Sequence, residues 1–435
     1  MKTKTSGKTV LACFLLTFFV LQNLLQQWMG PFQYADEMFA LLAVFLLPWK
    51  LLKKKLRLSW SRETVLFVVF LAVFWVSGWC GFFRYRYQPF LNAAKDSYVN
   101  LKFFLAAGAS YLIFAEDQEE AAARWQEGNG RKQRGDAVCQ MKQKLWLTLN
   151  GITAALFVLC VADLCFGIFD GDMRGGMRAV KLFYTAYTVL AGNCVLLCAV
   201  CLWLLEEKKK RAAVPLAMLA FVMLSTRRVK AVGALACILI IYLLVFRKKQ
   251  KLSRRIKLLA GGVVALAAAA GIYQVVSYYF LMGAESARAV LTIAAPFLAY
   301  DHFPFGTGWG TYGSAFSVEP YSPVYGMYRM AGVWGLSPGY PEFVSDTFWP
   351  MILGQCGFFG FLAFLAVFVL LVRRIFLLKQ EKGTFASALA VLAYLFISST
   401  SESAFANPIA VPLAFWLGVL LASCPQADGR QERLP

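Results

Sequence analysis

The sequence predicts an all-α polytopic membrane protein with about twelve transmembrane helices. Two features of its composition support this class. Of its 435 residues, 59% are hydrophobic and only 16% are charged, whereas an ordinary globular chain carries about 25% charged residues. The third observation is that the apolar residues recur along the whole chain in long stretches. A helix of roughly twenty such residues crosses a hydrocarbon core of about 30 Å.

The apolar stretches divide the chain into four parts. Residues 1–280 hold nine predicted spans with a polar cytoplasmic linker at 115–144, and residues 281–346 form a large extracytoplasmic loop. Residues 347–423 hold three more spans, and residues 424–435 form a cytoplasmic tail. The second, seventh and eighth spans are short or interrupted, so the count lies between ten and twelve. The predicted spans are 9–27, 37–51, 63–83, 92–114, 145–168, 182–205, 212–225, 228–246, 257–280, 347–372, 384–400 and 408–423.

The positive charges indicate how the chain crosses the membrane. If the N-terminus is cytoplasmic, the segments on that side hold 32 of the 44 Lys and Arg residues. That bias predicts cytoplasmic N- and C-termini in a plasma (inner) membrane. The net charge of +20 lies in short clusters between spans, which argues against a nucleic-acid partner. The cysteines lie mostly inside spans without histidine nearby, so we expect them to pack as small apolar residues, with no metal or other cofactor.

Charged residues that oppose this pattern are candidates for function. Arg227, Arg228 and Lys230 lie on the predicted outer side, where a helix begins that Ser225 or Thr226 could cap. A helix N-terminus beside two arginines is suited to a diphosphate; the alternative is that these cations reach lipid headgroups.

Five more charged residues flank or enter the fourth predicted span, and two of them, Arg84 and Arg86, precede it. Lys95 and Asp96 lie near its outer end, where interfacial side chains are common, and Lys102 lies deeper. A charge inside a span costs about 2.5–3.5 kcal/mol on insertion scales, so Lys102 is expected to pair or to line a wet cavity.

The predicted outer loop contains several candidates for chemistry. Arg288 is the only cation between Ile272 and Tyr328. Asp346 precedes the tenth span, where it is either a helix N-cap, as Ser345 could also be, or a carboxylate that accepts a proton from an attacking hydroxyl. His302, the only histidine, stands beside Asp301 and is a second candidate base.

A glycine-rich turn occupies the middle of this loop. Residues 308–313 read Gly-Trp-Gly-Thr-Tyr-Gly, but the spacing of a dinucleotide-binding turn has no meaning here without a preceding strand. Gly306 and Gly308 instead suggest a tight turn in which backbone approaches a ligand. Trp309 and Tyr312 have rings with a polar edge, which suit sugar faces and equally the membrane interface.

Two sequence blocks, in this order, resemble the O-antigen ligase and polymerase superfamily of bacterial envelope glycosyltransferases. The first is Pro304 to Tyr312, and the second runs from Ser345-Asp346-Thr347-Phe348 to Gly354-Gln355-Cys356-Gly357-Phe358-Phe359-Gly360. The resemblance covers roughly residues 215–375. It implies a GT-C-like architecture and metal-independent transfer of a glycan from an undecaprenyl-diphosphate carrier to an acceptor hydroxyl on the outer face.

The resemblance also implies roles for individual residues. Arg227, Arg228 and Arg288 would bind the diphosphate, and Asp346 stands where the ligases have a histidine. This difference favours a polymerase of surface-polysaccharide repeat units (capsule, exopolysaccharide or O-antigen), with Asp346 as the base or as the residue that orients the acceptor. Expected partners are the lipid-linked glycan, the bilayer, and flippase and chain-length regulator proteins.

Other classes remain open at this point. An O-antigen-type ligase would transfer the glycan to another acceptor. A flippase or transporter would be expected to show internal two-fold repeats, and a peptidoglycan polymerase of similar span number would carry other loop motifs. A structural scaffold would tolerate replacement of the outer arginines.

Overall fold

The fold is helical almost throughout, and one two-stranded hairpin is its only sheet among the residues described. The computed structural model describes residues 7–53, 61–115, 130–208, 211–247 and 276–423, with isolated residues between 258 and 273. The longer helices are α1 (Gly7–Trp28), α2 (Ala35–Leu52), α3 (Arg62–Tyr85), α4 (Phe90–Phe114), α6 (Gly130–Phe166), α7 (Tyr187–Lys208), α8 (Ala213–Ser225), α9 (Val229–Phe246), α11 (Ala287–Asp301), α13 (Trp349–Leu377), α14 (Lys382–Ser399) and α15 (Ala410–Ser423).

Shorter elements connect these helices. The hairpin pairs β1 (Met173–Arg174) with β2 (Met177–Arg178), and α12 covers Pro323–Met327. The 3-10 turns of the described ranges are Gly30–Tyr34, Gly283–Glu285, Ala315–Ser317 and Leu378–Gln380, and a π-helical turn covers Val276–Leu281.

Eight of the described helices are long and apolar enough to cross a membrane. They confirm the all-α polytopic class. The eight are α1, α3, α4, Cys139–Phe166 of α6, α7, α9, Trp349–Gln380 and α14. The predicted second, seventh and twelfth spans are helices as well, but α8 and α15 are shorter and α2 carries three charged residues. Ten of the 24 residues of the predicted ninth span, 257–280, lie outside the described residues, as does the whole tail at 424–435. The total of twelve spans therefore stays a prediction.

Two predicted connections contain more helix than expected. The linker at 115–144 ends earlier, because α6 begins at Gly130 and runs without interruption into the span. Its residues 116–129 are outside the described ranges. The predicted loop at 281–346 contains α11, which is shorter than a span and has Pro296 in its interior.

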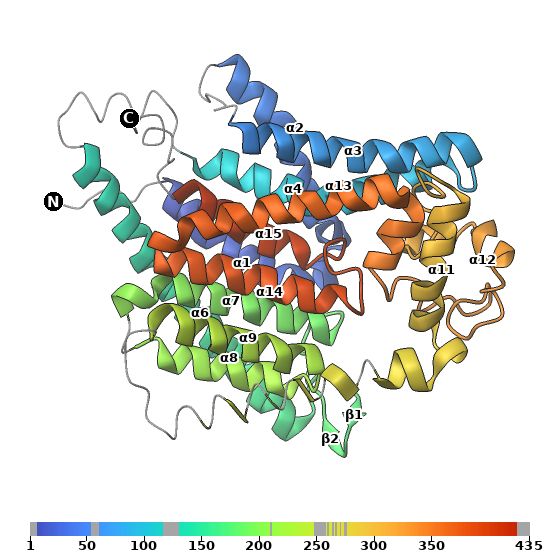
Figure 1. The fold of residues 1–435 in the computed structure, drawn as a ribbon. Helices are drawn as coiled ribbons and strands as arrows, with labels where there is room; N and C mark the ends of the chain where they lie inside the picture. The colour runs from blue at the N-terminus through green and yellow to red at the C-terminus, as the bar shows by residue number, and fades with distance from the viewer. Residues whose placement is uncertain are drawn as a thin grey trace.

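The helices pack side by side as a bundle, and the segment with α11 and α12 lies at one end of it (Figure 1). The principal pairings are α15 and α2 against α4, α13 against α3, and α14 against α7. Gly418 of α15 lets the backbone of α4 approach closely, since a Cβ there would lie 2.4 Å from the Ala107 carbonyl oxygen. Small residues have this role at helix contacts in membranes.

Connections that the span order places on the same side of the membrane also contact one another. At the α11 end, the Gln88 side chain donates to the Pro320 carbonyl at 2.8 Å and the Val180 amide donates to Ser225 at 2.9 Å. At the opposite end, Arg373 pairs with Glu63 at 3.0 Å. The alternation of the connections therefore matches the predicted order, while the direction across the membrane stays a prediction.

Lys102 is paired, as its depth in the fourth span predicted. Its ammonium lies 3.2 Å from a carboxylate oxygen of Asp36 in α2, and both side chains are almost completely buried. The Gln22 amide donates to the other oxygen of Asp36 at 3.3 Å. This arrangement meets the requirement that a buried charge be compensated by an opposite charge and hydrogen bonds.

Candidate functional site

Most of the ionisable groups that the sequence analysis singled out lie at the α11 end of the bundle. Four of them, Arg228, Lys230, Arg288 and Asp346, lie there with four residues that were not singled out from the sequence: Asp172, Arg174, Tyr187 and Glu402. We call these eight residues the loop-end cluster. They come from segments far apart in the chain: the β1–β2 hairpin and the residue before it, the start of α7, the α8–α9 turn with the start of α9, α11, the segment before α13 and the α14–α15 loop.

Arg288 and Asp346 form an ion pair within this cluster. The Arg288 guanidinium donates to Oδ2 of Asp346 from Nη2 at 2.7 Å and from Nε at 3.1 Å. About a quarter of each side chain is exposed. Asp346 is not a helix cap, because α13 begins three residues later, at Trp349, and its N-cap residue Phe348 has no side-chain cap bond. The N-cap alternative for Asp346, or for Ser345, is therefore wrong.

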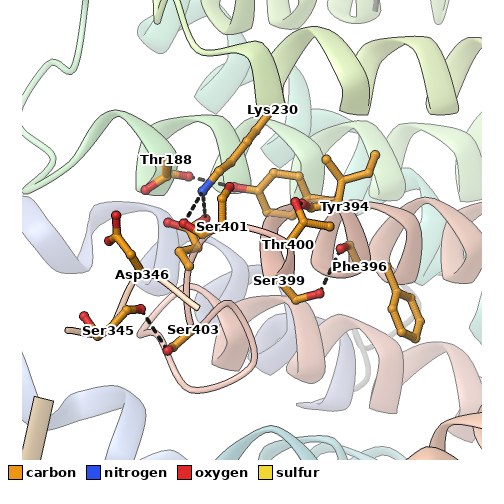
Figure 2. A network of polar contacts seen from close by, with 12 residues as sticks. Thr188, Lys230, Ser345, Asp346, Tyr394, Phe396, Ser399, Thr400, Ser401 and Ser403 are labelled. Carbon is orange, nitrogen blue, oxygen red and sulfur yellow. Dashed lines mark hydrogen bonds and ion pairs between the residues drawn. The ribbon is translucent and has the colours of Figure 1, made fainter. Parts of the chain in front are cut away.

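Lys230 forms a second ion pair beside the first. Its ammonium lies 3.2 Å from Glu402 in the α14–α15 loop, and less than a fifth of each side chain is exposed. The same ammonium is 3.5 Å from the Ser401 carbonyl oxygen. Figure 2 shows the Lys230 side chain pointing toward Ser401, and Asp346 in the same close view. Both Arg288 and Asp346 are near enough to act on the charge of Lys230, so the two pairs form one electrostatic unit.

The two neighbouring arginines of the α8–α9 turn point in different directions. Arg227 is exposed, adopts a left-handed backbone with φ of 55°, and places Nη2 3.0 Å from the sulfur of Met177 in the hairpin. Arg228 lies over the ring of Tyr187, 5.1 Å from its centroid. Burial lowers the pKa of Arg228 from its ordinary value, and the nearby charge of Arg174 lowers it further. Only Arg228 of this pair joins the cluster.

The α9 terminus is formed differently from the prediction. The N-cap residue is Arg228, in an extended conformation and without a side-chain cap bond. The hydroxyls of Ser225 and Thr226 donate back to carbonyl oxygens within α8, those of Phe221 and Met223. The predicted capping role of Ser225 or Thr226 is therefore wrong. The first backbone amides of α9, which lie at the loop end, receive no hydrogen-bond acceptor from the side chain of the N-cap residue.

The glycine-rich turn lies inside the fold, between α3, α4 and α13. A Cβ on Gly308 would lie 2.4 Å from the Phe82 nitrogen, and one on Gly306 would lie 2.5 Å from the Gly354 carbonyl oxygen. Both glycines have positive φ, 74° and 95° for Gly306 and Gly308. The close approach that the glycines permit is therefore to helix backbone, which corrects the expectation of a ligand there.

The two aromatic residues of the turn also face the interior. Trp309 and Tyr312 are both 0% exposed. The indole of Trp309 donates to the Trp75 carbonyl at 3.1 Å, and the Tyr312 hydroxyl donates to the Leu291 carbonyl. Their rings pack against the helices, so in this structure neither offers a face to a sugar.

Asp96 attaches this turn to α4. It is 2% exposed and accepts hydrogen bonds from the Gly310 amide at 2.8 Å and the Ser314 hydroxyl at 2.5 Å. The sequence analysis placed Asp96 at the membrane interface, whereas the structure buries it as an anchor for the loop. A carboxylate that accepts a backbone amide in this way satisfies a donor that burial would otherwise leave unpaired.

His302 and Asp301 lie at the end of α11, and each has a partner of its own. Both ring nitrogens of His302 have neighbours: Nδ1 lies 3.1 Å from the Leu298 carbonyl and Nε2 lies 3.3 Å from the Tyr87 hydroxyl. Burial lowers the pKa of His302. The Tyr328 hydroxyl donates to Asp301 at 2.6 Å. These contacts hold α11 to its surroundings, and neither residue belongs to the loop-end cluster.

Four members of the cluster were not predicted from the sequence: Asp172, Arg174, Tyr187 and Glu402. Glu402 is the only charged residue between Lys382 and Asp428, and this isolation on an outer connection was a usable signal. Arg174 follows the same logic as Arg228, because it is a cation on the predicted outer side. Tyr187 carried no signal, since an aromatic residue at the end of a span is common.

The chemistry available at the cluster is that of paired charges. In the part of the chain that the structure describes, no three His, Cys, Asp or Glu side chains gather as a metal site would require. The cations of such a cluster can bind a phosphate group, and a carboxylate beside them can take a proton from a hydroxyl. These are the two requirements of transfer from a diphosphate carrier.

Together the apolar helices and the charged loop end define a polytopic α-helical membrane protein with an ion-pair cluster at one end of its bundle. No family model and no curated protein matches the chain.

Proposed function

We propose that this protein is a membrane glycosyltransferase that polymerises oligosaccharide repeat units carried on undecaprenyl diphosphate, at the extracytoplasmic face of the plasma membrane. The proposal places the loop-end cluster on that face, with both termini in the cytoplasm.

One observation carries the proposal: a carboxylate and an arginine, Asp346 and Arg288, contact each other at 2.7 Å, and a further cation, Lys230, is near enough to interact with both. A transferase for a diphosphate-linked sugar needs a proton acceptor next to positive charge. Here the acceptor and the cations come from three separate segments of the chain: the start of α9, α11 and the residues before α13.

The proposed step uses these groups directly. The hydroxyl oxygen of the acceptor sugar attacks C1 of the donor sugar, and the bond from C1 to the diphosphate oxygen breaks. The proton of the hydroxyl passes to Asp346, and the electron pair of the broken bond stays on the carrier diphosphate. Arg288, with Lys230 and Arg228, stabilises the charge that develops there; such prearranged charges are often the largest single contribution to catalysis.

Purified protein, lipid-linked repeat units and a chelator in place of divalent metal provide the test. We expect a ladder of polymer on a gel, absent with Arg288→Ala and retained with Arg329→Ala, which removes an exposed cation elsewhere on the loop. A ladder that persists in Arg288→Ala, or that appears only with added metal, contradicts the proposal.

The same material separates the alternatives. Transfer of the glycan to a different acceptor without a ladder would indicate a ligase. Deleting the protein from cells distinguishes a flippase from a polymerase. Without a flippase, single lipid-linked units accumulate on the cytoplasmic side of the membrane, and without a polymerase they accumulate on the outer side. Reporter fusions at both termini test the proposed orientation, which fails if either terminus proves extracytoplasmic.

A further inference from the structure

Tyr187, the first residue of α7, holds two guanidinium groups. Arg228 of the α8–α9 turn lies 5.1 Å from the ring centroid and Arg174 of the hairpin lies 4.9 Å from it. The ring itself is buried, and its hydroxyl accepts the Asp172 amide at 2.7 Å. Cation–π contacts of this kind fix where a guanidinium lies without using its hydrogen-bond donors.

The positive charge at this place is incompletely compensated. Asp172 pairs with Arg174 at 3.2 Å, whereas no carboxylate in the described ranges lies within ion-pair distance of Arg228. Burial and the charge of Arg174 lower the pKa of Arg228, while Glu402 and Asp172 act in the opposite direction without forming an ion pair with it. Arg228 therefore lies next to a second cation without a direct counterion in the described ranges.

Both arginines also have a buried donor without an acceptor. The Nε atoms of Arg174 and Arg228 are inaccessible to solvent and have no hydrogen-bond partner among the residues described. A buried donor that finds no acceptor costs free energy, so such groups in a folded protein call for an explanation. Lys230 and Arg288 each contact a carboxylate, Glu402 and Asp346, as Arg174 contacts Asp172, so Arg228 is the cation of the cluster without one in the described ranges.

We propose that Arg174 and Arg228, held by Tyr187, form a binding site for a phosphate group, and that this site receives the diphosphate of the lipid-linked donor. The second half of this inference rests on the proposed function. Planar guanidinium forks match phosphate oxygens. The site also lies at the amino end of α9, where the helix dipole favours an anion.

The cations of the cluster then have different roles. Arg174 and Arg228 bind the diphosphate in the ground state, and Tyr187 positions them. Arg288 already contacts Asp346, so it acts next to the proton acceptor, where the bond to the sugar breaks. Arg174 thereby becomes a substrate-binding residue, and the hairpin that carries it becomes part of the site.

The first experiment measures binding of inorganic diphosphate to the purified full chain in detergent, by calorimetry. We expect Arg174→Gln and Arg228→Gln each to weaken the affinity about tenfold or more, as loss of a hydrogen bond to a charged group does. Arg329→Gln removes the same charge from an exposed position and should leave the affinity within about twofold. Unchanged affinity in either site variant, or equal loss in Arg329→Gln, overturns the site.

Tyr187 variants test the positioning role. Tyr187→Phe retains the ring and should bind diphosphate like the wild type, whereas Tyr187→Leu should lose affinity as Arg174→Gln does. Equal loss in both variants would mean that the hydroxyl, and with it the fold of the hairpin, is what matters, and the stacked arrangement would be refuted. Comparable thermal unfolding of the two variants shows that the comparison concerns binding.

Two further measurements separate the donor from other sources of phosphate. Undecaprenyl diphosphate should displace inorganic diphosphate, and phosphatidylglycerol in the same detergent should not; displacement by both would make the site a general headgroup site and overturn the donor assignment. If diphosphate binding depends on Arg174 while the wild type makes no polymer from competent substrate, the proposed function fails and the phosphate site stands. If polymer forms equally in Arg174→Gln, the donor assignment fails and the proposed function stands.

Discussion

Alanine at Gly308 should loosen the loop from the bundle, and the structure allows the size of the effect to be worked out. The new Cβ would lie 2.4 Å from the Phe82 nitrogen and 2.6 Å from its Cα, and these atoms belong to helix backbone that cannot rotate away. Overpacking of this kind costs about 1–3 kcal/mol. The backbone at Gly308 has φ of 95°, which adds about 1–3 kcal/mol for a residue with a side chain.

We therefore expect Gly308→Ala to destabilise the protein by about 2–6 kcal/mol. Thermal unfolding of the purified protein in detergent measures this, and the apparent Tm should fall by roughly 4 °C or more. Gly326→Ala is the matched control, because Gly326 lies in α12 of the same loop, has no left-handed backbone, and would place its new Cβ with nothing within 4 Å. Its Tm should rise slightly or stay unchanged.

The comparison also has a clear failing result. If Gly308→Ala unfolds within about 1 °C of the wild type, the turn is not packed between α3 and α13 as described. If Gly326→Ala is equally destabilised, the effect belongs to the loop in general, and the contact with Phe82 does not explain it.

Three other predictions follow from particular contacts. Asp346→Asn should leave the Tm nearly unchanged, because its ion pair with Arg288 is partly exposed and so contributes only about 1 kcal/mol. Polymer output in the gel assay should fall by about 10²-fold or more, and full output would show that Asp346 is not the base. Lys102→Met leaves Asp36 buried without a countercharge and should cost about 3–5 kcal/mol, measured as the yield of folded protein from membranes, and Asp36→Asn in the same chain should recover part of that yield; equal yields for wild type and Lys102→Met would refute this. Burial lowers the pKa of His302, so the unfolded state takes up a proton at this histidine before the folded state does as the pH falls. The wild-type Tm should therefore drop between pH 7 and pH 5 more than the Tm of His302→Gln. Parallel Tm profiles would contradict the effect of burial.

The sequence was sufficient for the helices that carry a simple apolar pattern. The predicted spans at 63–83 and 384–400 differ from α3 and α14 by two residues or fewer at each end. The start of α6 was missed because residues 130–144 are polar, and a polar helix that continues into a span has no apolar edge to mark its beginning. The hairpin was missed because its strands have two residues each; the Gly175-Gly176 pair between two Met-Arg repeats was the available signal.

The candidate site was predictable as a list of residues and not as an arrangement. Charge placement on the outer side singled out Arg228, Lys230 and Arg288, which do gather at one end of the bundle. Their partners could not be inferred, since Asp346 is 58 residues from Arg288 and no periodicity links them. For the glycine-rich turn, the glycines correctly predicted that another group approaches the backbone closely. The sequence does not say whether that group is a ligand or, as in the structure, the backbone of a helix.

The Asp36–Lys102 pair has a consequence for how the chain enters the membrane. Each of these side chains alone opposes insertion by about 2.5–3.5 kcal/mol, and α3 is synthesised between the helices that carry them. The carboxylate of α2 therefore remains without its countercharge until α4 leaves the ribosome. We expect α2, α3 and α4 to pass from the translocon to the lipid together, so that a chain truncated before Lys102 would retain α2 at the translocon or the membrane surface.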